Sequence, residues 1–270
     1  MRFFFCKALL WVTAITFVAS LTPVAQAALS DADKAEIRDV VRQLLRDEPQ
    51  LVLQLLQANS EAVLEIAQQG NIARKRKLLL AQWQRDATEP KSVSLEARDF
   101  RGADNAPVTI VAFSDYSCSY CLQSEAVLES MLARFKGKVR VVFKPLPKED
   151  IPVSLAAAKY SLAAFLQDAD KGWRLHDLLF QRIDLMEQGG DAFIKTLAEE
   201  IGLDYKKLRA DAASSRVEKI LASDRAEADA LGITGTPFFL VNNLVIRGAL
   251  SEELFEEAVK MALELVAKKK

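Results

Sequence analysis

Two cysteines three residues apart, Cys118 and Cys121, directly follow a predicted strand and open a predicted helix. The strand is the apolar, β-branched run at 108–113, and apolar side chains recur at helical spacing over 122–135. Cys118 is therefore expected near a helix N-terminus, where free backbone N–H groups and the helix dipole favour an anion. A thiolate is such an anion, and it is the nucleophilic form of cysteine. Cys121 lies one turn further on, close enough to attack a mixed disulfide at Cys118, so the spacing suits disulfide exchange.

The first 27 residues have the pattern of a secretory signal peptide. A basic start is followed by an apolar stretch and by an A-x-A site at 25–27. An uncleaved membrane anchor is the weaker alternative, because polar residues and a proline at 20–23 interrupt the apolar run before the roughly 20 residues that a spanning helix needs. We expect cleavage before Ala28 and a periplasmic protein.

After this cleavage Cys118 and Cys121 would be the only cysteines. In an exported protein such a pair is either a structural staple or a redox pair. A staple that closes so short a loop removes little entropy from the unfolded chain, so it would add little stability. The redox role is favoured.

Residues 28–88 are predicted to form a separate helical segment. Ser30 or Asp31 can cap its first helix, and Pro49 ends that helix and can start a second one. The second helix is apolar on almost every side over Leu51 to Leu56, and so short a segment cannot bury this apolar surface on itself. We expect homo-oligomerisation, with a trimer as first choice and a dimer as second. The alternative is that these helices pack back on the rest of the chain.

From residue 89 onward the pattern is α/β. The strand at 108–113, the cysteine helix and a second buried strand at 139–144 predict a right-handed parallel crossover. A helical insertion is expected at about 152–231. Strands at 237–241 and 244–247 then form a hairpin, and a last amphipathic helix covers 252–266.

Three features together resemble the thioredoxin fold in its DsbA-like branch, which carries a helical insertion. They are the C-x-x-C after FSDYS, the G-T-P at 235–237 before a strand, and the hairpin followed by a helix. The likeness covers about residues 93–267. With the helical segment added, the chain is similar to the suppressor of copper sensitivity protein C group of exported, oligomeric proteins. The implied fold is α/β: a thioredoxin-like catalytic domain at 89–270, preceded by an all-helical oligomerisation segment.

The resemblance implies roles for the residues of the C-x-x-C motif. Cys118 would be the exposed nucleophile and Cys121 the buried resolving thiol. Ser119 and Tyr120, between them, would tune the redox potential of the pair. DsbA oxidases usually carry a histidine between the cysteines, which helps to stabilise the thiolate, and this chain does not.

The resemblance also implies a substrate-binding loop. Pro237 would be a cis-proline facing the disulfide, and the backbone at Thr236 would pair with an extended substrate. The acid that DsbA oxidases bury six residues before the first cysteine is Ala112 here. Asp115 either replaces it as a proton acceptor for the resolving thiol or caps the turn before the helix. Both roles need a carboxylate near a helix N-terminus, and both remain open.

These observations predict an exported thiol–disulfide oxidoreductase acting on proteins with cysteines or wrong disulfides. Isomerase or reductase activity is favoured, a dithiol oxidase is the alternative, and a membrane redox partner is expected. A periplasmic Cu(I) carrier is the rival from another class, since thiolate pairs bind this ion. Two cysteines and one packed or surface histidine, His176, are too few for zinc within one chain, and no cofactor is expected. The net charge of −1 gives no pull toward nucleic acid.

Overall fold

The computed structural model describes residues 29–96 and 98–268, so the predicted signal peptide at 1–27 and the cleavage before Ala28 lie outside the described residues. Among the described helices, none combines the length and the apolar character that crossing a bilayer requires. The chain divides after Gln69 into two compact units.

The first unit is helical, as predicted. It holds α1 (Asp31–Asp47), α2 (Pro49–Ala58) and the beginning of α3 (Ser60–Asp86). Ser30 forms a capping box with Asp33, each side chain accepting a backbone N–H from the other residue. No side chain of α1 or α2 is buried within the single chain. Their large apolar side chains are therefore exposed: Ile37, Val40, Val41, Leu44, Leu45, Leu51, Val52, Leu53, Leu55 and Leu56.

The second unit begins inside α3, after Gln69, whereas the sequence places the boundary at residue 88. Trp83 is completely buried, and it belongs to the core of the α/β domain together with Leu79 and Leu80 beside it. The end of α3 belongs to this unit because the domain shields its large apolar side chains from water. The alternative that the helices pack on the rest of the chain thus holds for the last part of α3.

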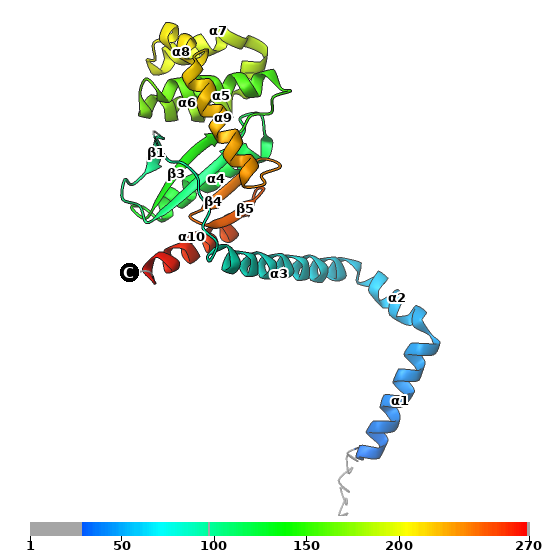
Figure 1. The fold of residues 1–270 in the computed structure, drawn as a ribbon. Coiled ribbons are helices and arrows are strands. Elements are labelled where there is room, and N and C mark those ends of the chain that lie inside the picture. The colour runs from blue at the N-terminus through cyan, green and yellow to red at the C-terminus, as the bar shows by residue number, and fades with distance from the viewer. Residues whose placement is uncertain (1–28, 97, 269–270) are drawn as a thin grey trace, which may run out of the picture. The chain divides into compact units, whose positions relative to one another are not determined.

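The α/β domain is built on one five-stranded sheet in the order β1-β3-β2-β4-β5 (Figure 1). β2 and β3 run parallel and the other pairs are antiparallel, which confirms the predicted crossover and hairpin. The strands are β1 (Phe100–Gly102), β2 (Val108–Ser114), β3 (Val139–Pro145), β4 (Phe238–Val241) and β5 (Leu244–Arg247).

The sequence does not predict β1, because a strand of three residues is too short to show an alternation of apolar and polar side chains. Gly102 has a φ of +122°, and a Cβ at this position would lie 2.5 Å from the Val139 carbonyl oxygen. The close approach of β1 to β3 therefore requires glycine here.

Helices cover both faces of the sheet. α4 (Ser119–Arg134) and α10 (Glu252–Ala267) pack on one face, and the end of α9 (Ser215–Ala230) packs on the other. The predicted insertion forms a helical layer with its own core beside the sheet (Figure 1). Besides α9 it consists of α5 (Pro152–Phe165), α6 (Ala169–Gln181), α7 (Ile183–Ile201) and α8 (Tyr205–Ala212).

Candidate functional site

The nucleophile predicted from the sequence, Cys118, is the N-cap residue of α4. Its backbone is extended, with φ −93° and ψ 116°, and its carbonyl accepts the N–H groups of Cys121 and Leu122 at 3.0 and 3.1 Å. Its side chain is partly exposed, and the thiol lies 3.6 Å from the carbonyl oxygen of Thr236. The sulfur thus stands at the positive end of a 16-residue helix, as the motif predicts.

The second cysteine has the opposite environment. Cys121 is fully buried in the core of the insertion, and the backbone N–H of Asp115 points at its sulfur from 3.5 Å. Burial raises the pKa of the Cys121 thiol to about 12. Hydrogen bonds from the side chains of Ser114 and Thr236 and from the Asp115 backbone act against this rise without cancelling it. At neutral pH Cys121 is a protonated thiol.

The carboxylate of Asp115 organises the turn between β2 and α4. Its Oδ1 accepts the backbone N–H and the hydroxyl of Ser117, at 2.9 and 3.0 Å, and the hydroxyl of Ser154 at 2.7 Å. Its Oδ2 accepts the backbone N–H of Lys148 at 3.3 Å. The group of Asp115 that reaches Cys121 is its N–H. Of the two roles left open by the sequence, the contacts support the turn-forming one.

The proposed substrate loop faces the cysteines from the start of β4. The Thr236–Pro237 peptide bond is cis, and the carbonyl of Pro237 accepts the N–H of Gly248 at 2.9 Å. A groove of about 490 Å³ runs between this loop and the first turn of α4. Its walls come from Tyr120, Gln123, Thr236, Pro237 and the segment 248–251. Tyr120 of the motif is therefore a groove residue, and Ser119 beside it is exposed.

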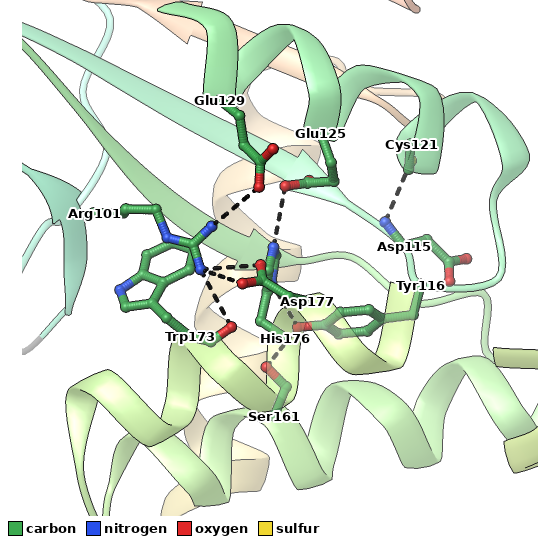
Figure 2. Close-up of polar contacts among 10 residues, drawn as sticks. All are labelled: Arg101, Asp115, Tyr116, Cys121, Glu125, Glu129, Ser161, Trp173, His176 and Asp177. Carbon is green, nitrogen blue, oxygen red and sulfur yellow. Dashed lines mark hydrogen bonds and ion pairs between the residues drawn. The ribbon is translucent and has the colours of Figure 1, made fainter. Parts of the chain in front are cut away.

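Two further residues near the cysteines, Ser114 and Tyr116, were not singled out by sequence reasoning. Ser114 ends β2, and its side chain acts to lower the pKa of Cys121. Tyr116, in the turn, is buried, and its hydroxyl contacts Ser161 at 2.6 Å and His176 at 3.0 Å (Figure 2). His176 was expected to be a packed or surface residue; it is packed, with 1% of its surface exposed. The hydrophobic run before the cysteines gave no sign of these polar contacts, which reach 45 and 60 residues along the chain.

The described residues contain no cluster of three or more His, Cys, Asp or Glu side chains that could hold a metal ion.

Residues 94–261 match the model of the thioredoxin family. The chain belongs to this family. A structural relative of the DsbA-like branch is ScsC of Proteus mirabilis in a transitional conformation, with a TM-score of 0.55 and 25% identity, covering 89% of this chain and all of that one. These findings confirm the thioredoxin fold and the resemblance to DsbA-like proteins.

Two curated relatives each match part of the chain. Disulfide bond formation protein D of Bacillus subtilis is 25% identical over 179 residues, which are 63% of this chain and 79% of the relative. Na(+)/H(+) antiporter NhaA 3 of Salinispora tropica is 34% identical over 163 residues, which are 60% of this chain. The chain spans 24% of the length of that relative, so the likeness is to a domain-sized part of a longer protein.

Proposed function

We propose that this protein is a thiol–disulfide oxidoreductase that acts on disulfides of other proteins. The observation that carries the proposal is the unequal environment of its two cysteines. Cys118 is partly exposed at a helix N-terminus, whereas Cys121 is buried and protonated at neutral pH. One sulfur can thus reach a substrate disulfide while the other is held in reserve.

The first step is attack by the Cys118 thiolate on one sulfur of a substrate disulfide. The substrate S–S bond breaks, its electron pair leaves on the second substrate sulfur, and a mixed disulfide to Cys118 forms. If another substrate thiolate attacks this mixed disulfide, a new substrate disulfide forms, Cys118 is released and no net oxidation occurs. If Cys121 loses its proton and attacks instead, the substrate leaves reduced by two electrons and the enzyme holds a Cys118–Cys121 disulfide. A membrane redox partner would then have to supply two electrons.

The groove beside the cis-proline is suited to the substrate chain. Its walls include Thr236 and Pro237, and the carbonyl oxygen of Thr236 lies 3.6 Å from the Cys118 sulfur. A substrate segment in extended conformation could pair with this backbone as an added strand. Tyr120, with 61% of its surface exposed, offers an aromatic contact to the same segment.

Isomerisation or reduction is the favoured direction, and dithiol oxidation is the alternative. Donating a disulfide is driven by a very stable reduced form, and the Ser119-Tyr120 dipeptide lacks the histidine that stabilises the thiolate of DsbA oxidases. Thr236 before the cis-proline resembles disulfide isomerases more than oxidases.

The exposed apolar faces of α1 and α2 support homo-oligomerisation. Leu55 and Leu56 keep 65% and 46% of their surface exposed within a single chain, and a contiguous apolar surface of this kind marks an interface. A trimer is the first choice and a dimer the second. Several catalytic domains in one assembly would raise the effective concentration of thiols around a misfolded substrate, which favours isomerisation.

Refolding of scrambled ribonuclease tests the proposal. We expect the mature chain from Ala28 to restore ribonuclease activity, a chain starting at Gly70 to do so much less, and Cys118→Ser to be inactive. Strong oxidation of reduced ribonuclease without rescue of the scrambled form would make the protein an oxidase. Stoichiometric Cu(I) binding without any disulfide turnover would support the Cu(I) carrier instead.

A further inference from the structure

One buried imidazole contacts both ends of the segment that carries the two cysteines. His176 of α6 lies with Nδ1 3.0 Å from the hydroxyl of Tyr116, two residues before Cys118 (Figure 2). Its Nε2 lies 3.2 Å from Oε2 of Glu125, on α4 one turn beyond Cys121. The two contacts bracket the C-x-x-C motif and join it to the helical insertion.

The hydrogen bonds of this group can all be satisfied together. The Glu125 carboxylate can only accept, so Nε2 of His176 carries a hydrogen. Nδ1 shares a hydrogen bond with the hydroxyl of Tyr116. The same hydroxyl donates to Oγ of Ser161, 2.6 Å away. Burial raises the pKa of Tyr116 well above its usual value, which keeps this donor protonated.

The imidazole is itself held in place from several sides. The rings of Trp173 and Phe180 meet it edge-on, each with its centroid 5.1 Å from that of the imidazole. The next residue, Asp177, binds the guanidinium of Arg101 on β1 at 2.8 Å, and this guanidinium stacks 4.6 Å above the Trp173 ring (Figure 2). A residue fixed in this way can fix the groups it binds.

We infer that His176 is a positioning residue for disulfide exchange: by holding Tyr116 and Glu125, it sets where the Cys118 sulfur stands relative to the substrate loop. The inference rests on the proposed function. With 1% of its surface exposed, His176 does not touch substrate, so it acts on the rate of attack and not on substrate binding. Reaction rates fall steeply when a nucleophile is displaced by even about 1 Å.

Two substitutions separate this role from simple core packing. His176→Phe keeps an aromatic ring and removes both polar contacts, and His176→Gln keeps an amide that can bind Tyr116 and Glu125. With scrambled ribonuclease as substrate, we expect His176→Phe to lower kcat roughly 10- to 100-fold and to change KM less than about twofold. His176→Gln should recover most of this loss. Tyr160→Phe is the matched control, because it removes a buried tyrosine hydroxyl that bonds to Asp191 of α7 and not to the motif.

Hydrogen exchange of the peptides over 115–125, in the reduced proteins, gives a readout that does not depend on turnover. We expect faster exchange there in His176→Phe than in the wild type or in Tyr160→Phe. Wild-type kcat and wild-type protection in His176→Phe would overturn the inference. If that variant does not fold, Tyr116→Phe and Glu125→Ala each remove one end of the bridge, and wild-type kcat in both would overturn it as well. If the wild-type protein shows no thiol–disulfide exchange activity, the proposed function is wrong. The hydrogen-exchange data would then still show whether His176 holds the segment 115–125 in place.

Discussion

The indole N–H of Trp83, near the end of α3, donates to the carbonyl oxygen of Val245 on β5 at 2.9 Å. The backbone N–H of the same Val245 donates to Oδ2 of Asp86 at 3.0 Å. β5 is an edge strand of the sheet, and both outward-facing backbone groups of Val245 are thus used within the chain. An edge strand with unpaired groups is prone to pair with other chains, and α3 prevents this here.

Replacing Trp83 should destabilise the α/β domain. Trp83→Ala removes a fully buried aromatic side chain, and we expect the free energy of unfolding to fall by about 3–5 kcal/mol. Chemical denaturation followed by circular dichroism measures this loss. Leu78→Ala is the control on the same helix, because Leu78 keeps 61% of its surface exposed and its truncation should change stability by less than about 0.5 kcal/mol.

The same contact determines where the chain can be shortened. A chain starting at Gly70 keeps Trp83 and Asp86 and lacks the exposed apolar helices, so we expect it to be folded and monomeric by light scattering. A chain starting at Lys91 loses both contacts to Val245 and should be markedly less stable to denaturant. Equal stability of the two shortened chains would show that α3 is dispensable for the domain, and a monomeric chain from Ala28 would refute self-association.

The local patterns of the chain were enough to predict much of the fold. The run at 108–113 and the hairpin at 237–247 are strands because their β-branched and aromatic side chains are buried in the sheet, and the structure places β2, β4 and β5 there. The positions of both cysteines were predicted from the junction between the strand at 108–113 and the helix that follows it. A short strand such as β1 has no such pattern, because pairing with β3 decides its conformation.

Pairing between distant side chains could not be predicted. Lys144 is a charged residue near the end of a strand, yet it is buried and pairs with Asp224 at 3.1 Å and with Glu227 at 2.6 Å. These partners lie 80 and 83 residues further on, in α9. The bridge from Tyr116 to His176 is of the same kind. The sequence contains the residue types for such contacts, but the tertiary fold determines which of these residues pair.

The two cysteines should differ in alkylation. In the reduced protein we expect iodoacetamide to modify Cys118 first, since Cys118 is partly exposed while burial shields Cys121 and raises its pKa to about 12. Peptide mapping by mass spectrometry after short reaction times measures the order. Faster modification of Cys121 would reverse the roles of nucleophile and resolving thiol.

The buried thiol also predicts a pH dependence of stability. The usual pKa of a cysteine is 9.0 and that of folded Cys121 is about 12, so between these values the folded state keeps a proton that the unfolded state has lost. The contribution of this thiol to stability is therefore fully present below about pH 9 and falls as the pH rises toward 12, by up to about 4 kcal/mol. Other groups titrate in the same range. The measurement is thus a difference between Cys118→Ser and the double variant Cys118→Ser/Cys121→Ala, and a difference that does not change above pH 9 would contradict it.

Asp115 offers a test between its two candidate roles. If it forms the turn, Asp115→Asn should keep the bonds to Ser117 and Ser154, because the amide oxygen can accept as Oδ1 does. The rate at which Cys121 resolves a mixed disulfide should then stay within about threefold of the wild type, while Asp115→Ala should lose stability by about 1–3 kcal/mol.

If Asp115 accepts the proton of Cys121, Asp115→Asn should slow resolution by about 100-fold or more without a loss of stability. Stopped-flow release of a fluorescent thiol from the mixed disulfide at Cys118, combined with denaturation of the same variants, separates these outcomes. The four hydrogen bonds to the carboxylate lead us to expect the first.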